Sequence, residues 1–362
     1  MRTVFVIGAG ANVEIGMPDG NRLKESIAER LNMKHAPENG DEIIYSALKE
    51  SVKESNGTVN EYIEKALMDV ASNILIAMPL AISIDSYIEA HKDDRRITLC
   101  GKLGITRVIL DAERECALFT AYGQTESLKN TDEKVTQLNN SWYPLFFEKI
   151  TDGCSFNELE FRFRNVSFII FNYDRCFEYF MYNALMNYYH INSDKAEYFV
   201  QHLHINHPYG TVGNLWDDKG RLTFGETPDS RRLMFLAQRI KTFTESENID
   251  QEEDDKNRVK YLVDRADRII FLGFAYHDQN LDLLFKQRGV IQDAIPPSEN
   301  ITCYGTGYQV SDNDQVTVRR LLEQANKKIK IKECIISETD ITCARFFKKF
   351  WYTLSFKEPE NS

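Results

Sequence analysis

The sequence predicts an α/β fold in which a doubly wound parallel sheet carries a large helical insertion. Short apolar strands alternate with amphipathic helices in the later part of the chain, and the first strand runs directly into a glycine-rich turn. Residues from about 35 to 160 show helical periodicity and few strand signals. Strand–helix alternation is typical of a parallel sheet with helices on both faces, which is a Rossmann-like arrangement. At 362 residues the chain is long enough for such a core and an inserted lobe.

The first predicted strand covers residues 3–7, where consecutive apolar residues precede the glycine-rich turn. A helix is expected after it, because Leu23, Ile27 and Leu31 recur at four-residue spacing. The insertion is expected to be helical, since its apolar residues trace single helix faces, as they do at residues 105–116.

Five further strands and the helices between them complete the predicted core. The strands cover residues 166–171, 198–205, 268–272, 300–304 and about 328–332. The helices lie near residues 174–188, 229–247, 256–266, 278–287 and 312–326. The predicted domains are a core of residues 1–34 and 160–335, a helical insertion of residues 35–159, and a tail of residues 336–362. The tail carries aromatic residues at helical spacing, so we expect it to pack on the core or at a subunit interface.

Composition and charge narrow the class of protein. The net charge of −11 argues against a protein whose main task is to coat nucleic acid, because phosphate binding draws on clustered Lys and Arg. The longest apolar run, residues 74–84, is too short to span a bilayer and contains Pro79, so no membrane association is expected. A strand at residue 3 leaves no room for a signal peptide, and seven scattered cysteines favour a reducing compartment. We therefore expect a cytoplasmic protein.

The turn after the first strand, GAGAN at residues 8–12, points to a nucleotide ligand. Glycines let the backbone approach a pyrophosphate, and the following helix directs its N-terminal amides at the phosphates. The third glycine is Gly16 rather than position 13, so the dehydrogenase fingerprint G-x-G-x-x-G is not met. The sequence thus predicts dinucleotide binding, but not by an ordinary oxidoreductase.

Polar residues follow the strand at 166–171, at the sheet edge where parallel sheets bind ligands. Asn172 can hold a ribose hydroxyl or a water molecule with its amide donor and acceptor. Asp174 can orient that amide or cap the next helix. The pattern alone also fits a purely structural interpretation, in which Asp174 is an N-cap and Asn172 is a turn residue.

Histidines cluster near the strand at 198–205. His207 follows the strand end and can act as a general base near neutral pH. His202 and His204 are expected to share one face of the strand. The three histidines also raise the alternative of a metal site, but no carboxylate or cysteine partners stand at the required spacing. We therefore favour a half-buried strand face and expect no metal.

Two later turns add to the same edge. Gly273 and Phe274 follow the strand at 268–272, and Gly305 follows the strand at 300–304. Each turn alone is ordinary turn chemistry, but four such turns at one edge of a sheet form a credible ligand site.

Taken together, these residues resemble a sirtuin-like (silent information regulator-like) domain. Sirtuins open with G-A-G-x-S and G-I-P-D-F-R, continue with Q-N-I-D, and then supply a catalytic histidine before a glycine. The corresponding segments here are residues 8–12, 16–19 and 171–174, followed by His207, with the glycine displaced to Gly210.

The departures from the sirtuin pattern bear on activity. No C-x-x-C pair is present, so the four-cysteine zinc module of protein-deacylating sirtuins is lacking. Gly20 and Asn21 replace the F-R of the motif, and Asn12 replaces its serine. This combination resembles the sirtuin-like NAD hydrolases of bacterial anti-phage defence, some of which assemble with a HerA-type hexameric ATPase. The resemblance implies NAD as substrate, no required metal, a homo-oligomer, a HerA-type partner, and only indirect contact with nucleic acid.

The resemblance also implies roles for individual residues. Asn172 positions the ribose or the water, His207 accepts a proton, and Asp174 orients its neighbours. The residues implied in NAD binding are Gly8, Ala9, Gly10, Asn12, Pro18, Asp19, Gly273, Phe274 and Gly305. The glycine turn and Asn12 cradle the diphosphate, and Asp19 shapes the nicotinamide pocket. His204 is the alternative catalytic histidine.

The implied function is an NAD glycohydrolase that depletes NAD during abortive infection and is gated by oligomerisation or a partner ATPase. Three alternatives stay open at this point. They are an NAD-dependent protein deacylase or ADP-ribosyltransferase, a non-catalytic subunit that binds NAD or ADP-ribose, and a nuclease subunit of a defence complex.

Overall fold

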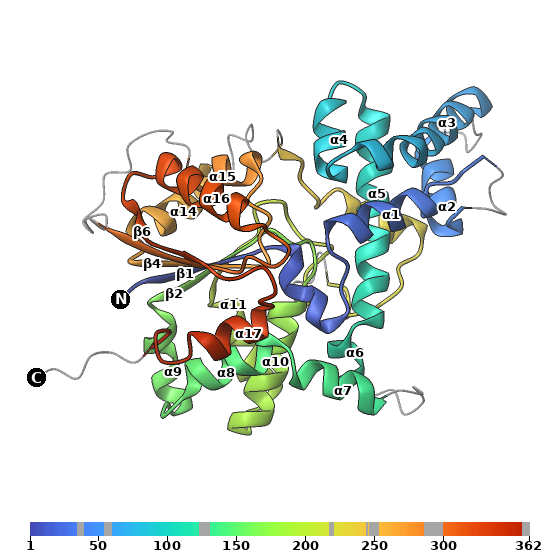
Figure 1. The fold of residues 1–362 in the computed structure, drawn as a ribbon. Coiled ribbons are helices and arrows are strands. Elements are labelled where there is room, and N and C mark those ends of the chain that lie inside the picture. Colours follow the sequence, from blue (N-terminus) through green and yellow to red (C-terminus); the bar gives the residue numbers. More distant parts are fainter. Residues whose placement is uncertain are drawn as a thin grey trace, which may run out of the picture.

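The protein folds around a six-stranded, all-parallel sheet with helices on both faces (Figure 1), which confirms the predicted α/β fold. In the computed structural model the described residues are 1–34, 40–53, 60–122, 131–216, 221–243, 245, 253–285 and 300–356. The strands are β1 (Thr3–Ile7), β2 (Val166–Ile170), β3 (His204–Asn206), β4 (Arg268–Leu272), β5 (Ile301–Gly305) and β6 (Ile329–Ile336).

The strand order is β3-β2-β1-β4-β5-β6, so the chain builds outward from β1 in both directions. The point where the direction reverses lies between β1 and β4, and ligands of doubly wound sheets bind beyond the carboxyl ends of the strands at such a point. Ile7 of β1 is in register with Ile170 of β2 and Leu272 of β4. The turns after these three strands therefore begin at the same level.

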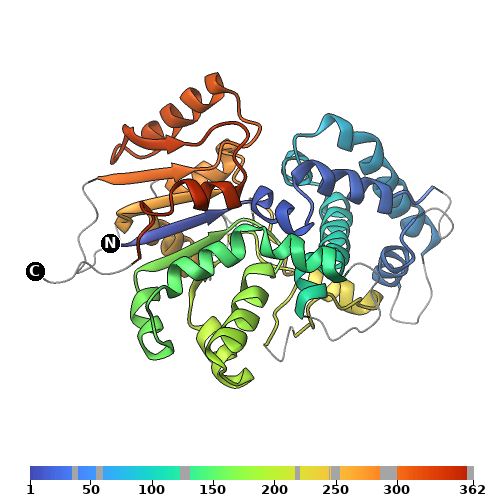
Figure 2. The same cartoon turned by 60° about the horizontal axis from the view of Figure 1, so that its bottom comes forward.

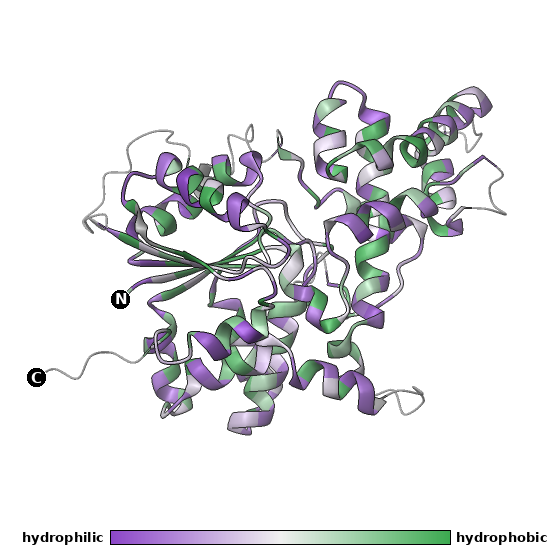
Figure 3. Cartoon of the chain, in the orientation of Figure 1, coloured by the Kyte–Doolittle hydropathy of each residue, from purple (hydrophilic) through white to green (hydrophobic). Residues whose placement is uncertain are grey.

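Helices cover both faces of the sheet. One face carries α14 (Glu253–Arg265), α15 (Asp278–Phe285) and α16 (Asp312–Ala325) (Figure 1). The other carries α8 (Trp142–Thr151), α9 (Phe156–Phe163), α10 (Cys176–Tyr189), α11 (Ser193–Gln201) and α17 (Cys343–Lys349). In Figure 3 the central strands are largely green, whereas most helices have a green side and a purple side, as expected for helices that cover a core.

A helical lobe lies beyond the carboxyl ends of the strands (Figures 1 and 2). It consists of α1 (Gly20–Arg30), α2 (Glu42–Ser51), α3 (Glu61–Ala77), the short 3-10 helix η2 (Met78–Leu80), α4 (Ile84–Ala90) and α5 (Arg95–Glu115). Helix α12 (Ser230–Ala237) packs against α2 and α5. The remaining elements, η1 (Ala9–Ile15), α6 (Ala117–Tyr122) and α7 (Thr131–Asn139), connect the lobe with the sheet.

The range predicted as the insertion contributes to two places in the fold. Helices α2 to α5 form the lobe together with α1, whereas α8 packs under the sheet. Phe146 of α8 lies edge-on to Phe5 of β1, with ring centroids 5.4 Å apart, and the Trp142 indole N–H donates to the Ala11 carbonyl over 3.0 Å. Helix α8, which lies inside the range predicted as the insertion, therefore belongs to a helical layer of the core.

The C-terminal helix α17 packs on the same face. Phe346 and Phe347 are fully buried, and the Phe347 ring stacks on that of Trp142 with centroids 6.1 Å apart. The Glu14 carboxylate accepts the Ala344 amide of α17 and the Trp142 amide of α8. This single side chain therefore joins the first turn, the α8 layer and the tail.

One predicted strand is largely wrong. Residues 198–201 continue helix α11, and β3 is limited to His204–Asn206. Asn192 caps α11 by accepting the Lys195 amide, and buried Ala196 and Val200 recur at helical spacing, which favours the helix. His202 ends that helix, so His202 and His204 do not share a strand face.

Across the described ranges, no single helix is long and apolar enough to cross a membrane. Only Glu61–Leu80 taken together with Ile84–Ala90, a pair bent by 117°, meets the length and composition for a span.

Candidate functional site

The turn after β2, residues 172–175, is fixed by the helical lobe. The Tyr173 hydroxyl donates to the Asp85 carboxylate of α4. The Arg175 guanidinium bonds the Glu113 carboxylate of α5 over 2.5 Å and 3.1 Å, and its backbone amide donates to the same carboxylate over 2.9 Å. Two successive helices of the lobe thus hold the turn from outside the sheet.

The turn is also tied to the glycine-rich segment after β1. The Asn12 amide nitrogen donates to both carboxylate oxygens of Asp174, at 3.0 Å and 3.1 Å, and the Tyr143 hydroxyl donates to the Asn12 oxygen over 2.8 Å. Asp174 also accepts the Cys176 amide at the start of α10. Burial raises the pKa of Asp174, although these hydrogen bonds oppose the rise. The N-cap residue of α10 is Arg175, so Asp174 is not the N-cap; from the position before it, Asp174 accepts the first amide of the helix and bonds the buried Asn12 side chain.

Asn172 differs from its neighbours because its side chain has no hydrogen bond to any residue that the structure describes. The residue is 5 % exposed, yet neither its amide oxygen nor its amide nitrogen has a hydrogen-bond partner among the described residues. A buried polar group left unpaired costs roughly 1–3 kcal/mol, so such a group generally binds a water molecule, an ion or a ligand. The three residues that follow Asn172 hold this amide in place at the sheet edge.

His207 follows β3 and lies beside Asn172. Its Nδ1 faces the Asn172 carbonyl at 3.2 Å, and its Nε2 faces the Glu178 carboxylate of α10 at 2.8 Å. Burial alone would lower the pKa of His207, but the charge and hydrogen bond of Glu178, the Asn172 carbonyl and the Asp174 charge together raise it. Both ring nitrogens face oxygen acceptors, an arrangement that the protonated ring satisfies with its two N–H groups.

Sequence reasoning missed Glu178. The residue stands in the first turn of α10, four positions after Asp174, and its carboxylate lies 2.8 Å from the His207 Nε2. An acidic residue in the first turn of the helix that follows Asn172 was the available signal, but acidic residues are common there for helix-dipole reasons alone.

The glycines of the turns after β1 and β4 pack against each other across the switch point. The Gly10 amide donates to the Gly273 carbonyl over 3.0 Å. A methyl group on Gly8 would lie 2.5 Å from that carbonyl oxygen, and one on Gly273, whose φ is +54°, would lie 1.9 Å from the Ala11 nitrogen. These glycines therefore permit close contact of two backbones. The amides of Gly8, Gly10 and Ala11 bond to carbonyls of the protein, so a phosphate has to be held by other groups.

Other predicted binding residues mainly serve the fold. A methyl group on Gly305 would lie 2.3 Å from the Tyr276 hydroxyl. Phe274 is 5 % exposed, and its ring lies 5.2 Å from Phe171 and 5.3 Å from Tyr276. These rings form an apolar floor beneath the turns at the carboxyl edge.

The segment that leads into the lobe holds three further predicted contacts. Asp19 caps α1 by accepting the Arg22 amide over 2.9 Å, and Pro18 precedes it, half-buried. Ala9, also half-buried, is the first residue of η1. The structure places them on the path from β1 to the lobe, whereas His207 contacts the Asn172 carbonyl directly and lies near enough to Asp174 to be affected by its charge.

The other two histidines have separate partners. His204 is exposed, and the Arg258 guanidinium donates to its Nδ1 over 3.3 Å. Partial burial and the Arg258 charge lower the pKa of His204. His202 bonds the Tyr198 carbonyl through Nδ1 at 2.6 Å. Within the part of the chain that the structure describes, no three His, Cys, Asp or Glu side chains are grouped so that they could hold a metal ion.

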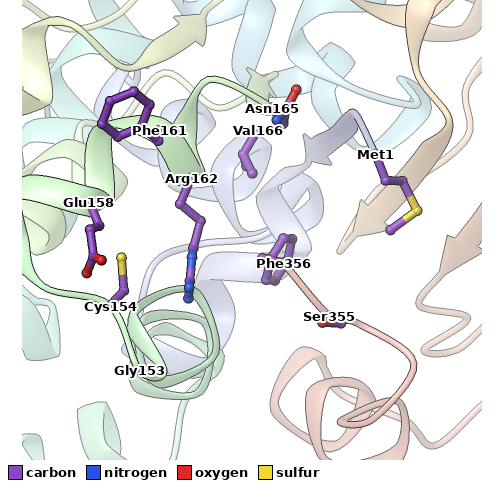
Figure 4. A pocket seen from close by; sticks show the side chains of 10 residues that line it. All are labelled: Met1, Gly153, Cys154, Glu158, Phe161, Arg162, Asn165, Val166, Ser355 and Phe356. Atoms are coloured by element: carbon purple, nitrogen blue, oxygen red, sulfur yellow. The ribbon is translucent and has the colours of Figure 1, made fainter. Parts of the chain in front are cut away.

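A hollow of about 250 Å³ opens at the opposite, amino-terminal end of the strands (Figure 4). Its lining includes Met1, Asn165, Val166 and Phe356, which come from the starts of β1 and β2 and from the tail. The Arg162 guanidinium at its wall donates to two carbonyls of the protein, at 3.0 Å and 2.9 Å. The Arg162 guanidinium is therefore used by the fold, in contrast to the Asn172 amide.

Neither a scan against protein-family models nor a search of curated proteins finds a match to this chain. The proposal below therefore depends on the site itself and on the motifs in the sequence.

Proposed function

We propose that the protein is an NAD glycohydrolase that cleaves NAD to nicotinamide and ADP-ribose. The observation that carries the proposal is the buried Asn172 amide, which lies beside His207 at the carboxyl edge of the sheet and has no hydrogen-bond partner among the residues that the structure describes. Doubly wound sheets bind nucleotides at this edge. An amide offers one acceptor and two donors, which suits a ribose hydroxyl or a water molecule.

The motifs support the choice of NAD among nucleotides. The segments at residues 8–12, 16–19 and 171–174, followed by His207, resemble those of sirtuin-like domains, which consume NAD. The absence of any C-x-x-C pair in the sequence favours hydrolysis over protein deacylation, since deacylating sirtuins carry a four-cysteine zinc module.

The chemistry required at the site is modest. Loss of nicotinamide from the ribose passes through an oxocarbenium-like state, as in glycoside hydrolysis. Asn172 holds the attacking water or a ribose hydroxyl, and Asp174 and Asn12 keep the Asn172 turn in place. Phe171 and Phe274 exclude bulk water beneath the site.

Unchecked NAD hydrolysis is lethal, so the proposal includes a control on activity. By resemblance to the NAD hydrolases of anti-phage defence, that control is self-assembly or a HerA-type ATPase, and the purpose is abortive infection. The acidic chain, with net charge −11, fits contact with nucleic acid through a partner rather than directly.

Two measurements test the proposal. Calorimetry on the purified chain should detect NAD binding, and nicotinamide release should be measured both with purified protein and as NAD loss in cells that express it. Asn172→Ala and His207→Ala should each abolish release. The matched controls, Asn140→Ala and His202→Ala, replace exposed residues of the same types and should keep wild-type activity.

Absence of NAD binding by the wild type would overturn the proposal. Binding without release in either setting would favour the alternative of a non-catalytic NAD or ADP-ribose subunit. Full activity of both Asn172→Ala and His207→Ala would mean that the site lies elsewhere.

A further inference from the structure

Glu178 is the least explained ionisable group at the sheet edge. One of its carboxylate oxygens, Oε1, accepts the His207 Nε2–H over 2.8 Å. The other, Oε2, is buried and has no hydrogen-bond partner among the described residues, although the side chain as a whole is 15 % exposed. A half-satisfied buried carboxylate is costly unless a ligand or a proton completes it.

His207 contacts both residues that carry these unpartnered groups, Asn172 and Glu178. His207 bonds the Asn172 carbonyl on one side and the Glu178 carboxylate on the other. The side-chain amide of Asn172 and Oε2 of Glu178 therefore belong to two residues bridged by the same imidazole. The Asn172 side chain supplies an acceptor and a donor group and Glu178 Oε2 supplies an acceptor, and among the described residues these atoms are the unsatisfied buried ones of the two residues that contact His207.

His207 itself is poorly arranged to accept a proton. A general base needs a free lone pair on a ring nitrogen that faces the water, and here each nitrogen faces an oxygen of the protein instead. The ionisable groups that act on the ring are Glu178 on α10 and Asp174 in the turn after β2, and both favour the protonated form.

We propose that Glu178 is the catalytic carboxylate of this site, which takes the proton of the attacking water while the His207 imidazolium holds Glu178 in place. This inference rests on the proposed NAD hydrolysis. It assigns the base to an acidic residue that the sequence motifs do not include, and it changes the role of His207 from proton acceptor to positioning residue.

The proposed hydrolysis breaks one bond of NAD and forms another. The bond between the ribose anomeric carbon and the nicotinamide nitrogen breaks, and its electron pair stays on nicotinamide, which leaves as a neutral molecule. The water oxygen forms a bond to the anomeric carbon, and one water proton passes to Glu178 Oε2 and then to solvent. The products are nicotinamide, ADP-ribose and a proton. Carboxylates perform this role in inverting glycosidases.

The test compares nicotinamide release by the wild type, Glu178→Gln and the exposed control Glu160→Gln, whose side chain is 72 % exposed. Glu178→Gln should lower kcat at least about 100-fold, the size of a lost general base, with KM for NAD changed less than about threefold. Glu160→Gln should match the wild type. Glu178→Asp, which keeps a carboxylate, should recover part of the activity and serves as the second variant if Glu178→Gln unfolds.

The pH profile of kcat/KM separates the two roles of His207. If the imidazolium is required, activity falls as pH rises through the raised pKa of His207. If His207 were the base, activity would rise through the same range.

Each result decides between the proposals. Release of nicotinamide by Glu178→Gln within threefold of the wild type, or a profile that rises through the His207 pKa, would overturn the Glu178 assignment and leave NAD hydrolysis standing. A wild type that neither binds nor cleaves NAD would overturn both.

Discussion

The Arg175 guanidinium and the Glu113 carboxylate form a 2.5 Å ion pair whose side chains are 2 % and 0 % exposed. Arg175 stands at the start of α10 on the core, and Glu113 belongs to α5 of the helical lobe. The Arg175 guanidinium also donates to the Leu222 carbonyl over 2.6 Å. A desolvated pair with this many hydrogen bonds joins the lobe to the turn that carries Asn172.

Loss of one partner of this pair should be strongly destabilising. Glu113→Ala leaves a buried guanidinium without its counter-ion, which typically costs about 3–5 kcal/mol in the free energy of unfolding. Glu160→Ala, which breaks an exposed pair with Arg164, should cost less than about 0.5 kcal/mol. Urea denaturation of both variants measures the difference. A loss under about 1 kcal/mol for Glu113→Ala would contradict the structural role given to the pair.

The effect of replacing a glycine by alanine on stability should depend on the backbone conformation and the free space at that glycine. Gly273→Ala places a methyl group 1.9 Å from the Ala11 nitrogen at a φ of +54°, so we expect a loss of at least about 2 kcal/mol and a displaced turn after β1. Gly20→Ala is the matched control, because nothing lies within 4 Å of a methyl group there and the residue begins α1. It should be neutral or stabilising by up to about 1 kcal/mol. Thermal unfolding distinguishes the two, and equal midpoints would refute the predicted close packing.

Substitution of Asn12 and of Asn172 by alanine should have different effects on the free energy of unfolding. Asn12→Ala removes bonds to Asp174 and Tyr143 and leaves both buried, so the free energy of unfolding should fall by about 1–3 kcal/mol. Asn172→Ala removes a buried amide that has no hydrogen-bond partner among the described residues, so the free energy of unfolding should stay unchanged or rise by up to about 3 kcal/mol. Denaturant titration of the two variants checks the contrast. The reverse order would mean that Asn172 has a structural role and Asn12 does not.

Stability should depend on pH through His207. Its pKa is raised in the folded protein, so its contribution is complete below the unfolded value of about 6.5 and is lost as pH rises through the folded pKa. The difference in unfolding free energy between wild type and Glu178→Gln should therefore shrink as pH rises above about 6.5. The comparison cancels the contributions of Asp174 and Asp85, whose pKa values are also raised by burial. A difference that is constant from pH 6 to 9 would show that Glu178 does not act on His207.

Local patterns explain why most strands could be predicted. Strand β4 at Arg268–Leu272 matches its prediction residue for residue, because a short apolar run ends there at a glycine. Residues 198–205 misled the prediction, since aromatic and β-branched residues favour a strand while the spacing of Ala196 and Val200 and the Asn192 cap favour a helix. In the folded protein, burial of Ala196 and Val200 against the core favours helix α11.

The candidate site was only partly accessible from sequence. Asn172, Asp174 and His207 could be chosen because they follow strands whose ends meet at one edge. The inward orientation of Asn12 depends on Asp174 and Tyr143, which are 162 and 131 positions away, so no local pattern reveals it. The Glu178–His207 contact, 29 positions apart, depends likewise on the placement of a helix against a loop.

The two contacts from the lobe to the Asn172 turn have a mechanical consequence. Asp85 of α4 bonds Tyr173, and Glu113 of α5 bonds Arg175. Two helices of the lobe therefore bind the residues one and three positions after Asn172. These contacts join the lobe to the Asn172 turn directly, without passing through the sheet, so a displacement of α4 or α5 would act on the turn that carries Asn172.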